Sequence, residues 1–249
     1  RFFSQMIYLF SFFAIFKVTI VHLFRKISID ILFIFVIGSI FGSFFGLIVD
    51  RIPLRKSIIF GRSHCDSCQR LLAYRDLIPI FSQISSGSHC RYCESKIPYL
   101  YVFLEFSSAL IFVLAWVNYL KPSQFLLIIL SLILSAFDYR QHSFPFVIWF
   151  IFALSFILIF PLSPLFYFWL ILAVLAEKFN LRVGSGDFLW FFTASFSLTF
   201  LNEMLLLQIA CSLGIIYYLI TKKRAEIAFI PFLTIAYLML LFGHQILSP

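Results

Sequence analysis

Apolar residues run in long stretches along most of this 249-residue chain, and polar residues are confined to short intervals between them. A bilayer core takes about 20 apolar residues per helix, and helices satisfy their own backbone hydrogen bonds in lipid. The pattern therefore predicts an all-α, polytopic membrane helix bundle with about eight transmembrane helices. We expect them at 31–49, 99–120, 124–137, 144–160, 165–176, 188–201, 204–220 and 228–247.

Two of the intervals are short enough to be tight hairpins, Pro161–Pro164 and Asn202–Glu203. One further apolar stretch, 2–24, precedes the first expected helix and lacks the small-residue motif at which a signal peptide is cleaved. We interpret 1–28 as an atypical N-terminal extension.

Composition agrees with a membrane protein. The chain is 62% hydrophobic and 12% charged, whereas soluble domains are about 45–50% apolar and about 25% charged. A core of this size could not hide so much apolar surface. A soluble enzyme, a disordered chain and a secreted disulfide scaffold are therefore excluded.

The net charge of +8 is explained by membrane orientation. If 50–98 is cytoplasmic, alternation places 139–143, 177–187 and 221–227 on the same side. These four segments hold fourteen Lys and Arg residues, and the opposite loops hold only Lys121. Positive residues favour the cytoplasmic side. We expect contact with membrane lipid and no direct binding of nucleic acid, because no basic stripe lies on a soluble module.

The polar segment 50–98 contains two C-x-x-C pairs, Cys65–Cys68 and Cys90–Cys93, with 21 residues between them. Each pair follows Ser-His, so Ser-His-Cys-x-x-Cys repeats at a 25-residue step. Two such pairs supply four thiolates to one tetrahedral zinc ion. Two disulfides are the alternative, which a reducing cytoplasm disfavours. We therefore predict a zinc-ribbon-like loop.

The histidines before the two pairs, His64 and His89, are not needed as ligands, since four thiolates fill the site. Cys211 stands alone in an apolar stretch and is expected to be a small buried hydrophobe.

Two aspartates are placed at the cytoplasmic membrane face by the charge-based orientation. Asp138 closes one expected helix, and Asp187 opens another after Gly184-Ser-Gly186. An ionisable group at membrane depth costs about 2.5–3.5 kcal/mol on insertion scales, which makes each a candidate functional residue. The alternative is a helix-end role, with Asp187 as an N-terminal cap and Asp138 as a topology-setting charge.

Two facing carboxylates suit an aspartic protease, because neighbouring like charges share one proton. The ionised member accepts a proton from the attacking water, and the protonated member donates toward the oxyanion and the leaving amine. Gly184 and Gly186 would allow a tight turn and a close approach of substrate backbone.

Several motifs in order resemble the type 4 prepilin peptidases, membrane aspartic proteases of the Gly-x-Gly-Asp class, with the features of the branch that serves competence pseudopili. The resemblance runs from about Ile29 to the C-terminus. It rests on Gly42-Ser-Phe44, Asp50-Arg-Ile-Pro53, the paired C-x-x-C loop with Asp76-Leu-Ile-Pro79 and Tyr99 to Glu105, Phe137-Asp-Tyr-Arg140 followed by Pro145, and Gly184-Ser-Gly-Asp187.

The resemblance implies a function and a division of the chain. Such enzymes cut a short basic leader from prepilins or pseudopilins at the cytoplasmic face of the bacterial cell membrane, and many then methylate the new N-terminus with S-adenosylmethionine. It implies 29–49 as the first transmembrane segment, 50–98 as the cytoplasmic zinc loop and 99–249 as the catalytic bundle. Asp138 and Asp187 would be catalytic, with Gly184, Gly186 and Pro145 as supporting residues. The methyl-donor site is not placed by any motif.

Other functions fit less well. A rhomboid-type serine protease would use Ser185 with His244, but that class has Gly two residues before the Ser, where Val183 stands. A presenilin-like protease carries a Pro-Ala-Leu triplet, which is missing here. A non-catalytic transporter or zinc-loop sensor is the alternative from another class, although a transporter should have broken or charged helices in two corresponding halves.

Overall fold

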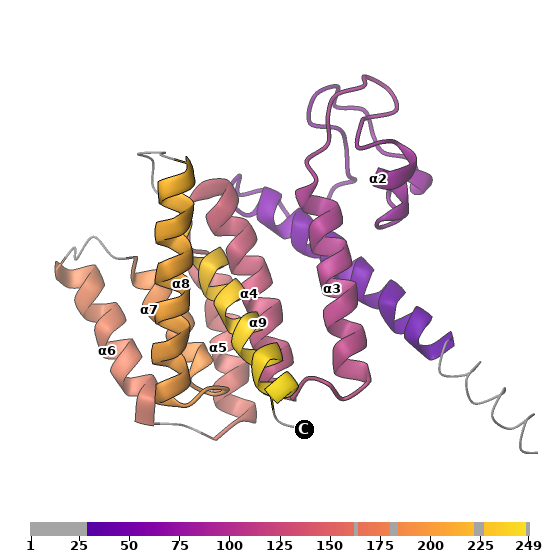
Figure 1. The fold of residues 1–249 in the computed structure, drawn as a ribbon. Helices are drawn as coiled ribbons and strands as arrows, with labels where there is room; N and C mark the ends of the chain where they lie inside the picture. Colours follow the sequence, from indigo (N-terminus) through magenta and orange to yellow (C-terminus); the bar gives the residue numbers. More distant parts are fainter. Residues whose placement is uncertain (1–28, 162–163, 180–183, 222–226, 248–249) are drawn as a thin grey trace, which may run out of the picture.

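A computed structural model describes residues 29–161, 164–179, 184–221 and 227–247. The predicted extension 1–28 lies outside the described residues. The described part is helical with two isolated β-bridges (Figure 1). A first helix, Ile29–Arg51, is followed by a polar loop that contains η1 (Tyr74–Asp76) and α2 (Phe81–Ser85). The remaining helices are α3 (Leu100–Trp116), α4 (Pro122–Gln141), α5 (Phe146–Ile159), α6 (Pro164–Phe179), α7 (Ser185–Ala194), α8 (Phe200–Thr221) and α9 (Ile230–Leu247).

The first helix packs on α3 through a stripe of glycines. A Cβ atom added at Gly38 would lie 2.7 Å from Ala109 Cα, and one at Gly42 would lie 2.5 Å from Glu105 Cα. Gly46 continues the stripe one turn further, against the ring of Tyr101. Small residues four apart let two membrane helices approach backbone to backbone. The helix pair lies beside the bundle, with the polar loop at one end of it (Figure 1).

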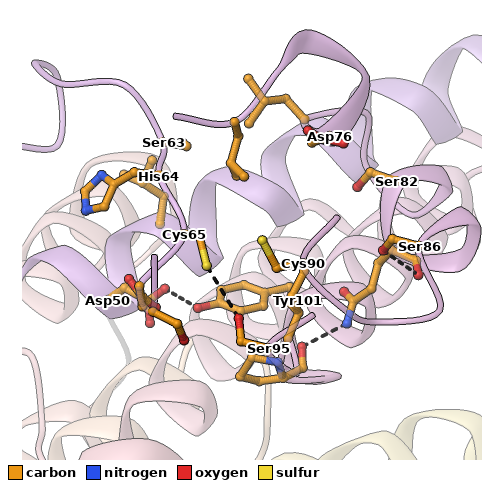
Figure 2. Close-up of a pocket in the computed structure, with 18 of the residues that line it drawn as sticks. Asp50, Ser63, His64, Cys65, Asp76, Ser82, Ser86, Cys90, Ser95 and Tyr101 are labelled. Atoms are coloured by element: carbon orange, nitrogen blue, oxygen red, sulfur yellow. Dashed lines mark hydrogen bonds between the residues drawn. The ribbon is translucent and has the colours of Figure 1, made fainter. Parts of the chain in front are cut away.

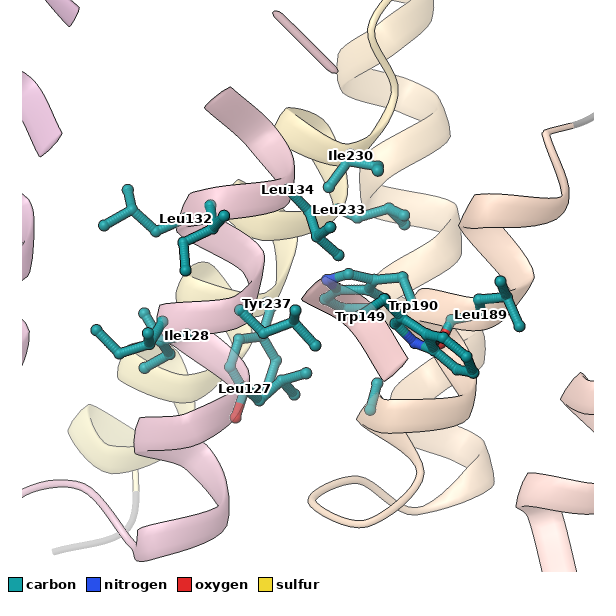
Figure 3. Close-up of a cluster of buried hydrophobic side chains, with 14 of the residues drawn as sticks. Leu127, Ile128, Leu132, Leu134, Trp149, Leu189, Trp190, Ile230, Leu233 and Tyr237 are labelled. Atoms are coloured by element: carbon teal, nitrogen blue, oxygen red, sulfur yellow. The ribbon is translucent and has the colours of Figure 1, made fainter. Parts of the chain in front are cut away.

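Helix α4 forms the centre of the bundle and packs against α3, α5, α7 and α9. Its side chains from Leu127 to Leu134 are all buried. They meet Leu233 and Tyr237 of α9 on one side and Trp190 of α7 on another (Figure 3). The core is therefore continuous between the middle and the C-terminal part of the chain.

Aromatic side chains fill the contacts around α7. Trp169 of α6 stacks on Phe191 of α7, with ring centroids 4.5 Å apart. Trp149 of α5 donates its indole N–H to the carbonyl oxygen of Leu189 at 2.7 Å. A buried Trp normally finds a partner for its N–H group. This bond and the stacking fix α7, the shortest of the apolar helices, between α5 and α6.

The prediction of an all-helical membrane bundle with a small four-cysteine loop is confirmed. Three described helices are long and apolar enough to cross a membrane: Ile29–Arg51, Pro122–Gln141 and Phe200–Thr221. Leu100–Trp116, Phe146–Ile159 and Ile230–Gly243 are apolar but shorter. Helix α7 has 10 residues, about 15 Å at 1.5 Å per residue, so it reaches only part of the way across a 30 Å core.

One expected turn is wrong. The hairpin predicted at Asn202–Glu203 lies at residues 195–199, and Asn202 and Glu203 belong to the first turn of α8. Glu203 is fully buried, and its Oε2 atom accepts a hydrogen bond from the indole N–H of Trp169 at 2.8 Å. A tertiary partner on α6 therefore allows a polar residue inside a helix, where its polarity alone suggested a loop. The other break is as predicted, since α5 ends at Ile159 and α6 begins at Pro164.

Candidate active site and metal centre

The two C-x-x-C pairs fold as a structural repeat. His64 forms an antiparallel bridge with Leu71, and His89 forms the same bridge with Lys96, 25 residues further on. Equivalent backbone bonds recur in both halves: the N–H of Cys65 donates to the Arg70 carbonyl at 3.0 Å, and that of Cys90 to the Ser95 carbonyl at 2.8 Å. The repeat seen in the sequence is therefore two equivalent knuckles.

The knuckles bring their four thiols together. The Sγ atoms of Cys65, Cys68, Cys90 and Cys93 all lie within 4.8 Å of one another, and those of Cys65 and Cys93 are 3.8 Å apart. Zn–S bonds of about 2.3 Å in a tetrahedron separate the sulfurs by ~3.8 Å. The four cysteines are free thiols. The donor set and its spacing fit a tetrahedral metal ion.

Local hydrogen bonds prepare two of the thiols for metal binding. The backbone N–H of Cys68 and the Ser95 hydroxyl lower the pKa of Cys65 to about 6. The Ser95 hydroxyl and backbone also lower the pKa of Cys93. At Cys68, a backbone hydrogen bond from Arg70 lowers the pKa of the thiol. Loss of hydration and the neighbouring thiols of Cys93 and Cys65 outweigh this bond and raise the pKa to about 11.

The histidines of the repeat face the backbone. His64 Nδ1 lies 3.3 Å from the Arg62 carbonyl oxygen, and His89 Nδ1 lies 2.7 Å from the Gly87 carbonyl oxygen. Each ring thus contacts the backbone of its own turn, as expected of residues that are not ligands. Cys211, expected to be buried, is exposed on the surface of α8. Because α8 is long and apolar enough to cross a membrane, lipid would cover this surface.

The second candidate site lies at the end of the bundle nearest the cysteine loop. Asp138 is in the last turn of α4, and Asp187 is in the first turn of α7. Both residues are partly buried. Helix α7 packs against α4, and Gly186 in its first turn lies against Phe144, just beyond the end of α4. The fold thus brings to one end of the bundle two carboxylates that are 49 positions apart in the sequence.

The two carboxylates differ in their partners. Asp138 Oδ2 accepts a hydrogen bond from the backbone N–H of Ile230 at 3.0 Å. Ile230 is the first residue of α9, so Asp138 caps the positive end of that helix, which favours a negative charge. No hydrogen bond to the Asp187 carboxylate is found within the described part of the chain. The environment therefore favours ionisation of Asp138 over that of Asp187.

A buried hydrogen bond sets α7 against α4. The indole N–H of Trp190 donates to Ser131 Oγ at 2.8 Å, and both residues are fully buried. Trp190 is three residues from Asp187, and Ser131 is seven residues, two turns, from Asp138. These spacings put each aspartate on the same helix face as the bonded residue below it. The bond therefore aligns the two faces that carry the carboxylates.

The residues predicted to support the site pack around the start of α7. The carbonyl oxygen of Gly184 accepts the backbone N–H of Asp187 at 3.1 Å. A Cβ atom at Gly186 would lie 2.4 Å from the ring of Phe144, so a side chain there would displace that ring. Phe144 precedes Pro145, the N-cap residue of α5. Gly186 thus lets the α4–α5 connection pack directly on α7.

A cavity of about 310 Å³ lies between the cysteine loop and the ends of the first helix and α3 (Figure 2). Its wall includes Asp50, Tyr101 and Glu105 from the helices, and Cys65 and Cys90 from the metal centre. Glu105 Oε2 accepts the backbone N–H of Ile80 at 2.6 Å, which ties the loop to α3. The cavity is therefore bounded on one side by the apolar helices and on the other by the four-cysteine cluster.

Sequence reasoning missed several of these contacts. The pairing of Asp50 with Arg140, the bond between Trp169 and Glu203, and the glycine stripe were not predicted. The stripe had a signal in the sequence, the four-residue spacing of Gly38, Gly42 and Gly46. The two polar pairs join residues far apart along the chain, and no local pattern indicates them.

The fold and sites together define a multi-pass helical membrane protein with a four-cysteine loop and a carboxylate pair at one end of its bundle. Residues 36–119 match the family model described as "Bacterial Peptidase A24 N-terminal domain". The similarity to the type 4 prepilin peptidase family, predicted from the motifs, is thereby confirmed for this part of the chain, and the relatives below support it.

Several curated relatives are described as prepilin leader peptidases. The chain is 40% identical over 91 residues to a "Prepilin leader peptidase/N-methyltransferase" of Bacillus subtilis, a match that covers 36% of each chain. It is 31% identical over 125 residues to one of Klebsiella pneumoniae, covering 45% of this chain and 54% of the relative. A third, from Myxococcus xanthus, is 36% identical over 80 residues, which are 32% of this chain and 24% of the relative. The matches thus span about a quarter to a half of these relatives. No solved structure matches the chain.

Proposed function

We propose that the chain is an aspartic endopeptidase that removes the leader peptide of type 4 prepilins or competence pseudopilins. The observation that carries the proposal is the placement of Asp138, in the last turn of α4, and Asp187, in the first turn of α7, at one end of two helices that pack against each other. The names of the relatives, prepilin leader peptidases, supply the substrate class.

We assign different catalytic roles to the two carboxylates because their hydrogen-bond partners differ. Asp138, held by the N–H at the start of α9, is the ionised member and acts as general base. Asp187, without such a donor among the described residues, holds the shared proton and acts as general acid. A carboxylate pair with one proton between its members is the protonation state that such hydrolysis needs.

The reaction then follows from these charge states. Asp138 takes a proton from a water molecule as the water oxygen attacks the scissile carbonyl carbon. Asp187 gives its proton to the carbonyl oxygen, which becomes a hydroxyl group of the tetrahedral intermediate. Collapse of the intermediate breaks the C–N bond: Asp138 gives the proton that it took from water to the leaving amine nitrogen, and Asp187 takes back a hydroxyl proton as the carbonyl group re-forms. The products are a leader with a new carboxyl terminus and a mature protein with a new amino terminus.

The proposed side of the reaction is the cytoplasmic face of the bacterial cell membrane. Arg140 follows Asp138 by two residues and pairs with Asp50 in the last turn of the first helix, where the loop begins, so the carboxylate pair and the loop lie at the same end of the bundle. Fourteen Lys and Arg residues lie in the segments assigned to this end, and positive residues favour the cytoplasm.

The proposed metal is zinc in a structural role. Four thiolates form a closed site, with no open position for a water molecule that would attack a peptide bond. Cys65, Cys68, Cys90 and Cys93 would hold the ion and fix the two knuckles against each other. The loop has few buried apolar side chains, so metal binding would supply much of its folding free energy.

N-methylation of the new amine is a second candidate activity, favoured by the cavity beside the metal centre. Its volume of about 310 Å³ is at the lower end of the range of ligand pockets. Both acidic and basic side chains, hydroxyl groups and an aromatic ring line it, which suits the zwitterionic and nucleoside parts of S-adenosylmethionine. That molecule would supply an electrophilic methyl group.

One experiment tests both activities. The purified protein in detergent is incubated with a panel of prepilins, with and without S-adenosylmethionine, and the products are identified by mass spectrometry. We expect loss of the leader in both conditions and a gain of one methyl group only with the donor. Intact substrates throughout the panel would contradict the peptidase proposal. Cleavage without methylation would remove the second activity and leave the first.

A further inference from the structure

Three helices meet in a polar cluster beside the candidate peptidase site. Asp50 lies in the last turn of the first helix, Tyr101 lies in the first turn of α3, and Arg140 lies in the last turn of α4. The hydroxyl of Tyr101 donates to Asp50 Oδ2 at 2.5 Å, and an Nη1 hydrogen of Arg140 bonds Asp50 Oδ1. Arg140 Nη1 also lies 3.3 Å from the Tyr101 oxygen. We call these three residues the clamp.

The clamp is more than an isolated ion pair. Each of its members contacts both of the others, and the Arg140 guanidinium lies over the Tyr101 ring, 5.8 Å from its centroid. The adjacent Gln141 donates from its side-chain amide to the Val49 carbonyl oxygen at 3.0 Å. Two consecutive residues of α4 are thereby attached to the last turn of the first helix.

The clamp holds α4 close to Asp138. Arg140 follows Asp138 by two residues, and α4 ends at the next residue, Gln141. The end of a helix frays unless something holds it. On its other side, Asp138 is held by the α9 backbone. The last turn of α4 is therefore fixed from two directions, by α9 at Asp138 and by the first helix at Arg140.

The clamp also joins the two parts of the molecule. Asp50 and Tyr101 belong to the region matched by the A24 N-terminal domain family, residues 36–119. Arg140 lies outside that region, on the helix that carries Asp138. The N-terminal region thus contacts the immediate surroundings of the carboxylate pair.

We propose that the clamp positions Asp138, with Arg140 as the positioning residue and Asp50 and Tyr101 as its anchors in the N-terminal region. The inference rests on the proposed peptidase function. None of the three residues needs to touch the substrate. Their effect is on the orientation of the carboxylate, and a displacement of about 1 Å can lower a rate about 100-fold.

Single substitutions test the clamp. In full-length protein, Arg140→Ala and Asp50→Ala should each lower kcat for leader cleavage about 10- to 100-fold, with KM changed less than about twofold. Tyr101→Phe keeps the ring and removes one hydrogen bond, so its effect should be several-fold. The matched control is Arg75→Ala, because Arg75 is an exposed loop arginine whose side chain is 66% accessible. It should retain the wild-type kcat.

Charge exchange separates positioning from stability. The double variant Asp50→Arg, Arg140→Asp restores an ion pair between the same two helices with the signs reversed. It should recover kcat to within about fivefold of wild type, whereas Arg140→Asp alone should be at least as impaired as Arg140→Ala. Metal content and thermal unfolding are measured on every variant to verify that the fold is kept.

The outcomes are distinct. A wild-type kcat in Arg140→Ala and Asp50→Ala, or a double variant no better than Arg140→Asp, overturns the inference. A loss of thermal stability with unchanged kcat also overturns it, since the clamp would then be structural only. If the wild-type protein cleaves no prepilin, the proposed function itself fails. If it cleaves and Asp138→Asn is inactive, the clamp is judged on its own variants.

Discussion

The cysteine loop and the helix bundle are held together by different forces. The loop exposes large apolar side chains, such as Ile59 at 85% and Phe60 at 78%, and buries mainly polar or thiol groups, Gln83, Ser88 and Cys90. In the bundle, Trp190, Phe137 and Leu127 are almost completely buried. The loop therefore depends on its four thiols, whereas the bundle depends on packing.

Because the loop depends on its thiols and the bundle on packing, a substitution in one region should have its main effect in that region. A change to the metal site should alter the loop and leave the bundle folded, and a change to a carboxylate should stop chemistry and leave both regions folded. The two regions meet at the clamp and the cavity, so effects that pass between them should be partial. The predictions below follow from this division, from the largest effect to the smallest.

Replacing either carboxylate should have the largest effect. Asp138→Asn and Asp187→Asn keep the shape of the side chain and remove the group that accepts or donates a proton. Each should reduce leader cleavage to below a few per cent of wild type, while metal content stays unchanged. The double variant should be no worse than either single one, because the pair acts as a unit. Single-turnover cleavage assays give the rates, and substantial activity in either single variant would contradict the assignment.

Removing a metal ligand should be the next largest effect. Cys68→Ser should lower the metal content from about one ion per chain toward zero and make the loop more sensitive to proteolysis. Cleavage should fall about three- to tenfold, less than in the aspartate variants, because the metal site is separate from Asp138 and Asp187. Elemental analysis and limited proteolysis provide the measurements. The matched control is Cys211→Ser, which should keep its metal. If metal removal abolishes cleavage as fully as Asp187→Asn, the metal belongs to the active site.

Breaking the bond between α4 and α7 should have a smaller effect. Ser131→Ala leaves the Trp190 N–H without its partner. It should lower the free energy of unfolding by about 0.6 kcal/mol, the average for hydrogen bonds between membrane helices, and by about 1.7 kcal/mol at most. Cleavage should fall with it, since the two faces lose their alignment. Ser155→Ala is the control, because the Ser155 hydroxyl bonds only within its own helix, to Ile151. Equal stability of the two variants would show that the bond contributes nothing.

Replacing Ser185 or His244, the nucleophile and base of the serine-protease alternative, or His142, the C-cap residue of α4, should have the smallest effect. Ser185→Ala, His142→Ala and His244→Ala should each change the rate of cleavage by less than about threefold, since none is given a chemical step. Serine-directed covalent inhibitors should leave activity intact. Inactivity of Ser185→Ala alone, with a folded protein, would favour the serine-protease mechanism.

Local patterns in the sequence were sufficient for much of this structure. Continuous apolar stretches predict the helices because lipid leaves few alternatives to a helix. The spacing of Cys65, Cys68, Cys90 and Cys93 predicts their meeting because each pair is a knuckle of fixed geometry. The two aspartates could be placed at one end of the bundle from the charge distribution, although the packing of α4 against α7 that brings their helix ends together needed the fold.

Contacts between distant residues could not be predicted in this way. Glu203 suggested a loop by its polarity, but a tryptophan 34 residues earlier bonds it inside a helix. Asp50 and Arg140 are 90 residues apart, and nothing near either one indicates its partner. Polar residues in a membrane bundle are ambiguous for this reason: their meaning depends on a partner that only the packing of helices reveals.

The bond between Asp138 and the start of α9 links chemistry to motion. If Asp138 is the base, it becomes neutral once in each catalytic cycle, and the end of α9 then loses the negative charge that caps it. The first turn of α9 should loosen at that step and tighten when the proton leaves. The first turn of α9, which takes no part in bond breaking, would thus loosen and tighten once in each catalytic cycle. Backbone amides around Ile230 should therefore exchange hydrogen faster during turnover than in the resting protein.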